Sequence, residues 1–189
     1  MTNTHLTRIY LTIAMVFLPL RIQAAEINGV KFDQTYKDRM VTMTLKGTGL
    51  KTMLFFKAFV AGFYTNADEC AYDVADVSKR IEVEYFVSIP SKKLNDYTIE
   101  RMKDNITPEE FRRINQQVKL MQKYFVDLKS GDRFSLTYIP GEGTQFAHNG
   151  KITGTIEGNE FARALFSVWV GEKPFDRQLK AQICGIKNV

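Results

Sequence analysis

The chain has 189 residues, of which 44% are hydrophobic and 25% are charged. This balance is typical of a globular protein and excludes an intrinsically disordered chain. The length favours one domain with a sizeable core, and there is no internal repeat or low-complexity segment.

The first 24 residues have the pattern of a secretory signal peptide. A polar start with one cation precedes the apolar run 9–20, and the segment ends in small residues. The run is too short to span a bilayer comfortably, so we expect cleavage after Ala24 or Ala25, export to the periplasm and no stable membrane anchor. Arg21 is unusual so close to a cleavage site, and an uncleaved anchor is the alternative.

Without residues 1–24 the chain keeps 24 basic and 21 acidic residues, a net charge of +3. This charge is too small to indicate a nucleic-acid partner. We therefore expect a single mature domain, residues 25–189, that does not bind nucleic acid.

The stretch 47–65 is the most apolar part of the mature chain. It follows a short hairpin or strand expected at 26–32 and a loosely alternating strand at 39–47. Gly47 and Gly49 predict a turn, followed by a long strand that is covered on both faces. Gly62, inside that strand, predicts a bulge or a close approach by another part of the chain.

The remaining elements are predicted from hydrophobic periodicity. Thr107, Pro108 and Glu110 form a capping box that starts one of the helices. In chain order we expect a helix and loop at 67–77, a strand at 79–90, helices at 91–106 and 107–128, a strand at 133–141, a hairpin at 144–156 that turns at Asn149 and Gly150, and helices at 159–173 and 175–185. This order predicts an α+β domain whose large, mostly antiparallel sheet has helices layered on one face.

Two cysteines, Cys70 and Cys184, remain in the mature domain. Export would permit a disulfide between them, but the spacing alone leaves open whether they are bonded or are two buried free thiols.

The side chains needed by the common catalytic sites are mostly missing. His148 is the only histidine outside the signal segment, and there is no Cys-x-x-Cys pair or phosphate-binding loop. We therefore expect no metal and no cofactor. What remains is an apolar cavity with few polar groups, which suits a hydrophobic ligand. Lys51 is the best candidate for the charge that orients such a ligand, with a solvent-directed lysine as the alternative.

Two stretches, "LKGTGLKTMLFFKAFVAGFYT" and "FARALFSVWVGEKPFDRQLKAQICG", resemble the chalcone isomerase family, and specifically its bacterial exported members. The resemblance extends over nearly all of the mature chain. It implies an open-faced β-sandwich with a ligand cleft between the sheet and the helices. Plant enzymes of the family cyclise a chalcone, whereas non-catalytic plant relatives bind fatty acids in the same cleft.

Most of the family's catalytic residues are replaced in this chain. The resemblance places the family's arginine at Lys51, which keeps the charge but loses the planar guanidinium. Its strand threonine or tyrosine falls at Phe59, its helix tyrosine at Phe111, and its late hydroxyl residue at Val168. Because these positions have lost the hydroxyls that stabilise developing charge, we do not expect chalcone cyclisation.

The leading hypothesis is a periplasmic binding protein for a fatty acid or a similar apolar anion. Lys51 would bind the anionic end, and the pocket would be lined by Phe55, Phe59, Phe63, Phe111 and Val168. One alternative is an isomerase or intramolecular lyase that acts on an enone-like substrate through Lys51. Another is an interaction protein whose cleft is filled by its own side chains. The sequence leaves the ligand and the oligomeric state open.

Overall fold

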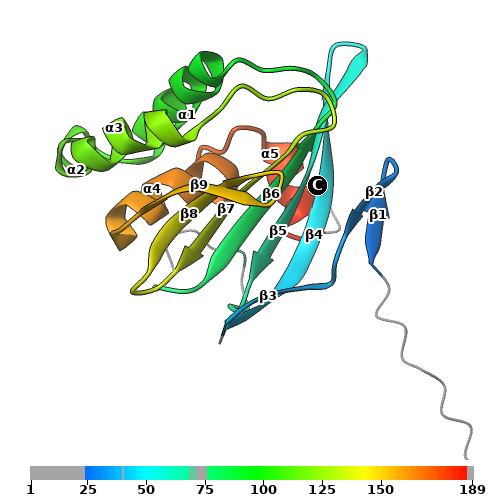
Figure 1. The fold of residues 1–189 in the computed structure, drawn as a ribbon, viewed down its shortest axis with the longest axis horizontal. Helices are drawn as coiled ribbons and strands as arrows, with labels where there is room; N and C mark the ends of the chain where they lie inside the picture. Colours follow the sequence, from blue (N-terminus) through cyan, green and yellow to red (C-terminus); the bar gives the residue numbers. More distant parts are fainter. Residues whose placement is uncertain (1–23, 40, 69, 71–75, 187–189) are drawn as a thin grey trace, which may run out of the picture.

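A single antiparallel sheet of 7 strands, in the order β3-β4-β5-β6-β7-β8-β9, organises the protein (Figure 1). The computed structural model describes residues 24–39, 41–68, 70 and 76–186. The predicted signal peptide lies outside these residues except for Ala24, as does most of the helix and loop expected at 67–77. The strands are β1 (Ala25–Ile27), β2 (Val30–Phe32), β3 (Thr35–Asp38), β4 (Val41–Met53), β5 (Phe56–Thr65), β6 (Lys79–Tyr85), β7 (Arg133–Ile139), β8 (Gly143–His148) and β9 (Lys151–Ile156).

The helices lie on one face of this sheet, and the small β1–β2 hairpin lies on the opposite side (Figure 1). They are α1 (Ser91–Asn105), α2 (Pro108–Arg113), α3 (Asn115–Tyr124), α4 (Asn159–Val170) and α5 (Arg177–Ile183). The predicted α+β class, with an antiparallel sheet and helices on one face, is therefore confirmed. Among the described residues, no helix combines the length and apolar character needed to cross a bilayer.

β5 is buried on both faces, as its continuous apolar sequence predicts. Phe59 and Phe63 belong to the main core under the helices. Val60 points the other way and packs with Phe32 of the β1–β2 hairpin. A Cβ atom at Gly62 would lie 2.8 Å from the ring of Phe32, so the close approach predicted at this glycine is confirmed.

The turn of the β4–β5 hairpin is not where the sequence predicts it. β4 continues through Gly47 and Gly49, and the turn falls at Leu54 and Phe55. A Cβ atom at Gly47 would lie 2.3 Å from the carbonyl oxygen of Gln182, and one at Gly49 would lie 2.7 Å from a side chain of α5. The two glycines therefore allow α5 to pack closely on the strand and do not make a turn.

The predicted helix at 107–128 is also interrupted. The capping box of Thr107 and Glu110 is confirmed at the start of α2, but the helix breaks at Ile114 and the chain is extended from Phe125. Periodicity misses the break because the spacing of apolar residues continues across it, with Ile114 and Val118 both buried.

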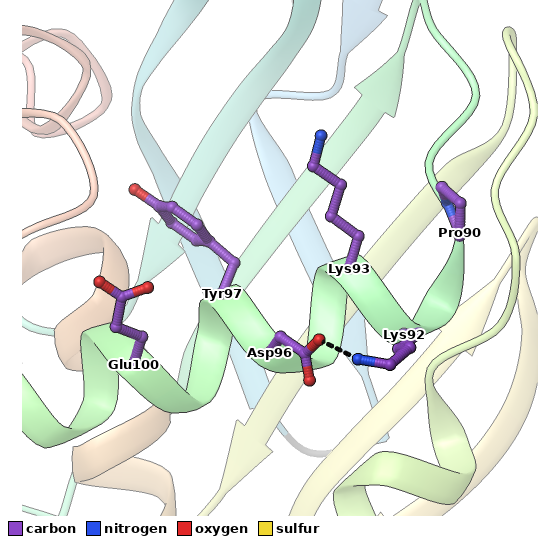
Figure 2. Close-up of a pocket in the computed structure, with 6 residues that line it drawn as sticks. All are labelled: Pro90, Lys92, Lys93, Asp96, Tyr97 and Glu100. Atoms are coloured by element: carbon purple, nitrogen blue, oxygen red, sulfur yellow. Dashed lines mark hydrogen bonds and ion pairs between the residues drawn. The ribbon is translucent and has the colours of Figure 1, made fainter.

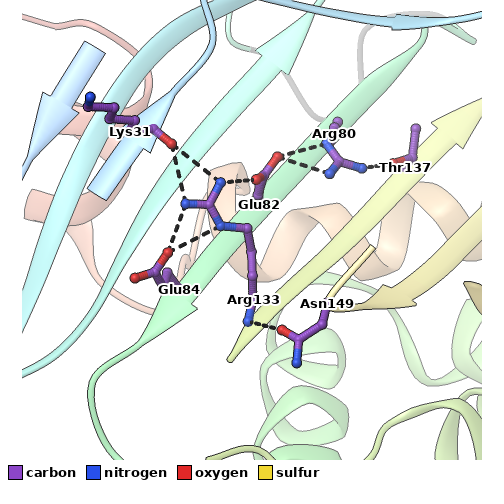
Figure 3. Close-up of polar contacts among 7 residues, drawn as sticks. All are labelled: Lys31, Arg80, Glu82, Glu84, Arg133, Thr137 and Asn149. Carbon is purple, nitrogen blue, oxygen red and sulfur yellow. Dashed lines mark hydrogen bonds and ion pairs between the residues drawn. The ribbon is translucent and has the colours of Figure 1, made fainter. Parts of the chain in front are cut away.

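Charged side chains cover the outer face of β6 and β7, and they fasten the β1–β2 hairpin to it (Figure 3). The Arg133 guanidinium lies 2.7 Å from Glu82 and 2.8 Å from Glu84. It also donates two hydrogen bonds of 3.3 Å to the carbonyl oxygen of Lys31. Arg80 lies 2.9 Å from Glu82. The outer face is therefore polar over β6 and β7, whereas the larger apolar core lies on the side that the helices cover.

Cys70 and Cys184 form a disulfide, which resolves the two alternatives left open by the sequence. The bridge joins the loop after β5 to the residue that follows α5, across a separation of 114 residues. A bridge that closes so long a loop restricts the unfolded chain strongly.

We predict that replacing Cys70→Ser and Cys184→Ser together lowers the free energy of unfolding by about 2–5 kcal/mol. Denaturant unfolding, with and without a thiol reductant, measures the change. Reduction should destabilise the wild-type protein by a similar amount and leave the variant unaffected. Equal stabilities of oxidised wild type and variant would contradict the prediction.

Candidate functional site

A small cavity lies between the inner face of β6 and β7 and helices α1 and α4. Its volume is about 20 Å³, which is enough for about one water molecule. The lining is apolar except for the hydroxyl-bearing Tyr85 of β6 and Thr98 of α1. Trp169 of α4, the only tryptophan in the chain, also lines it. In this structure the space between sheet and helices is therefore almost filled by the protein's own side chains.

An aromatic cluster of Phe59, Tyr97, Trp169 and Phe175 adjoins the cavity. The Phe59 ring centroid lies 5.9 Å from that of Trp169 and 5.8 Å from that of Phe175. Phe59 also contacts Tyr85, and Tyr97 packs edge-on against Phe175 at 5.2 Å. Trp169 lines the cavity, and Tyr97 lies on α1. The cluster therefore continues the apolar wall of the cavity as far as α1.

An ion pair between Lys51 and Asp176 lies beside this aromatic cluster. The Lys51 Nζ is 2.5 Å from Asp176 Oδ2 and 5.5 Å from the centre of the Phe175 ring. The exposed fraction of the side chain is 25% for Lys51 and 21% for Asp176. Lys51 is the cross-strand partner of Phe59, which puts both side chains on the helix-covered face of the sheet.

An open groove of about 430 Å³ runs along the outside of α1 (Figure 2). Tyr97 lines this groove and also packs against Phe175, so the groove adjoins the aromatic cluster. Figure 2 shows Lys93 projecting from the same side of α1 as Tyr97, whereas Lys92 pairs with Asp96. Within the part of the chain that the structure describes, Lys93 forms no ion pair.

Lys51 and Phe59 lie opposite each other on β4 and β5, and Phe59 contacts Tyr85 and Trp169 of the cavity wall. Neither Lys51 nor Phe59 lines the cavity itself. Phe63 and Val168 are buried in the core under the helices but do not line the cavity. The role of these residues in ligand binding stays a prediction.

Phe111 and Phe55 lie apart from the cavity. Phe111 of α2 is partly buried, and the Lys103 Nζ lies 4.9 Å from the centre of its ring. Phe55 is 100% exposed, because the turn falls at this residue and the chain does not continue there as a covered strand. The lining proposed from the sequence is corrected accordingly: Phe55 is a surface residue.

Sequence reasoning missed Tyr85, Thr98 and Asp176. Tyr85 is in phase with the buried Ile81 and Val83 along β6 and alternates with charged residues, so its inward direction follows from the sequence, but its place in the cavity wall does not. Asp176 is the N-cap of α5, but no local signal places it beside Lys51, which is 125 residues away. Burial raises the pKa of the Tyr85 phenol, so its hydroxyl stays protonated. Among the described residues there is no group of three metal-ligating side chains.

The electrostatics of Asp176 give a prediction for pH dependence. Partial burial raises the pKa of this carboxyl, but hydrogen bonds from Lys51 and from the Leu179 N–H outweigh it, and the pKa lies below the ordinary value of 3.8. Asp176 therefore stabilises the fold above pH 3.8, and this contribution is lost as the pH falls through the lower pKa of the folded state.

Asp176→Asn keeps the N-cap acceptor but removes the charge. We expect it to lower the free energy of unfolding near neutral pH by up to about 1 kcal/mol and to flatten the acid limb of the pH profile. Asp96→Asn, at an exposed ion pair on α1, is the control and should leave the profile unchanged. Parallel profiles for wild type and Asp176→Asn would contradict the prediction.

No curated protein matches the sequence significantly. Among solved structures, a crystal structure of a fatty-acid binding protein of Arabidopsis thaliana superimposes with a TM-score of 0.65, covering 86% of this chain and 96% of that chain at 16% sequence identity. At this identity the similarity shows the fold. A family model described as chalcone isomerase-like matches residues 24–185, which is nearly the whole described chain. The chain therefore belongs to the chalcone isomerase-like family.

Proposed function

We propose that this protein binds an apolar ligand with an anionic end, such as a fatty acid, between its sheet and its helices. The observation that carries the proposal is the unbroken series of side-chain contacts from Trp169 in the cavity wall through Phe59 and Phe175 to Lys51. The similar fold of a plant fatty-acid binding protein supports it.

Binding requires the site to open, because a cavity of about 20 Å³ cannot hold an acyl chain. Tyr97 lines the groove and packs against Phe175 of the aromatic cluster, so we expect ligand entry to displace these two rings. α1, whose Leu94 and Thr98 line the cavity, moves away from the sheet in this step. Each CH₂ group buried from water contributes about 0.8 kcal/mol, so a long acyl chain can offset the cost of opening.

The anionic end of the ligand replaces Asp176 as the partner of Lys51. Asp176 can release the ammonium group without losing all of its partners, because its other carboxylate oxygen accepts a hydrogen bond from the Leu179 N–H at 2.7 Å. Lys93, beside Tyr97 in the groove, supplies a second cation along the entry route.

Trp169 reports on this site, because it is the only tryptophan and lies in the cavity wall. We expect a long-chain fatty acid to change the tryptophan fluorescence in a saturable titration. Lys51→Ala should weaken the affinity by about tenfold, the effect of losing one charge-assisted contact. Lys37→Ala, which removes an exposed lysine of β3, is the matched control and should bind normally.

Two results would contradict this function. One is the absence of any fatty-acid response together with the absence of lipid in native mass spectra of the purified protein. The other is equal affinity in wild type and Lys51→Ala.

We also propose that the protein is exported to the periplasm. The apolar run 9–20 followed by Ala24 and Ala25 supports export, and so does the disulfide, which persists in an oxidising compartment. N-terminal sequencing of the protein from a periplasmic extract should give a chain that starts at Ala25 or Glu26. An intact Met1 in a cytoplasmic fraction would contradict it.

A further inference from the structure

The end of the β4–β5 hairpin carries four large apolar side chains in water. Figure 1 shows this end projecting beyond the rest of the sheet. The exposed fractions are 48% for Met53, 87% for Leu54, 100% for Phe55 and 48% for Phe56. We call these four residues the apolar tip. Isolated apolar residues are common on protein surfaces, but a contiguous and protruding group is typical of an interaction site.

The turn in the apolar tip is built from unusual residues. Leu54 has a φ of 52°, in the left-handed region, where glycine, asparagine and aspartate are favoured. A bulky apolar residue in this conformation is strained, and strain of this kind is concentrated at functional positions. A polar turn would be more stable and would keep the hairpin out of contact with other molecules. The choice of Leu54 and Phe55 therefore points to a function for their exposure.

A lysine whose charge is not compensated lies next to the apolar tip. Residues 39–67 contain no aspartate or glutamate. Lys51 is paired with Asp176 from α5, whereas Lys57 directly follows the tip. Lys57 is exposed and donates a 2.5 Å hydrogen bond to the uncharged Asn28 side chain, so its charge is not neutralised by this contact. Exposed apolar residues beside such a lysine match the surface of a membrane that contains anionic lipids, with acyl chains below negative headgroups.

The size and shape of the apolar tip fit a lipid surface better than a second copy of the chain. Four such side chains can bury on the order of 500 Å². A stable protein interface buries about 800 Å² on each partner. A convex tip also offers no pocket for a partner side chain, whereas it can enter a fluid headgroup layer without needing a complementary shape.

We propose that the apolar tip docks the protein on anionic membranes, with Met53, Leu54, Phe55 and Phe56 inserted at the level of the headgroups and Lys57 near the lipid phosphates. This peripheral contact requires no spanning segment. It is also independent of the proposed ligand, because docking can be measured on vesicles without any added fatty acid.

Flotation with phosphatidylglycerol-containing vesicles tests the proposal, with wild-type and variant proteins purified in the same N-terminal form. The wild type should float with these vesicles at low salt and much less with pure phosphatidylcholine. Combining Leu54→Ser with Phe55→Ser should reduce the partition coefficient by about tenfold or more. Lys57→Gln should reduce it severalfold at low salt, with little further effect at high salt.

Ile152→Ser is the matched control, because Ile152 is an exposed apolar residue of β9 with an exposed fraction of 55%. It should float like the wild type. The proposal is overturned if the wild type fails to float, or if the double variant floats equally well. It is also overturned if light scattering without vesicles shows a dimer that the double variant abolishes, since a second copy would then occupy the tip. Titrating the double variant with fatty acid, followed by tryptophan fluorescence, shows whether the ligand site is intact. A failure of membrane docking can therefore be told apart from a failure of the proposed ligand site.

Discussion

The close packing of α5 on β4 is the contact on which the candidate site depends. It is possible because β4 has no side chain at Gly47, where a Cβ atom would lie 2.3 Å from a carbonyl oxygen of α5. The disulfide at Cys184 fixes the end of the same helix. With α5 held in this way, its N-cap Asp176 reaches Lys51 on the strand below. The ion pair between Lys51 and Asp176 therefore depends on the absence of a side chain at Gly47.

The aromatic cluster closes the site, so contacts between its rings must be replaced by contacts with a ligand when the ligand binds. Its rings bury one another while the cavity is small, so opening exposes apolar surface that a ligand chain then covers again. At the charged end, a ligand carboxylate exchanges one ion pair for another, so the expected gain in affinity from Lys51 is only about tenfold. In the proposed function, the apolar chain therefore provides most of the affinity, and Lys51 chiefly determines which end of the ligand lies at the opening.

The apolar stretch 53–65 of the β4–β5 hairpin lies in two different environments. From Ala58 to Thr65 it is buried on both faces of the sheet, whereas Met53 to Phe56 are exposed at its end. Lys51 lies on the other strand of the same hairpin, opposite Phe59 near the start of the buried part. If the tip rests on a membrane, Lys51 is held near the lipid surface, and an acyl chain has only a short distance to travel from the membrane to the proposed site. The two proposals are consistent in geometry and can still fail separately.

Local sequence patterns determined most of the secondary structure and the class of the fold. The alternation along β6 and the capping box at Thr107 depend on neighbours a few residues apart, and for that reason they could be read directly. The order of the elements along the chain predicted a sheet with helices layered on one face, and the family resemblance agreed with this arrangement. The same patterns could not show the break at Ile114, because its apolar spacing continues on both sides.

Only the tertiary structure decided how Gly47, Lys51 and Phe55 are used. In each case the outcome depends on what the fold brings to the residue: a helix backbone at Gly47, a carboxylate from 125 residues away at Lys51, and only solvent at Phe55. A glycine in a strand, a lysine beside aromatics and a phenylalanine in an apolar run have the same sequence signature in either environment. Composition and spacing describe the chain near a residue, whereas burial and pairing are properties of distant segments that meet only in the folded protein.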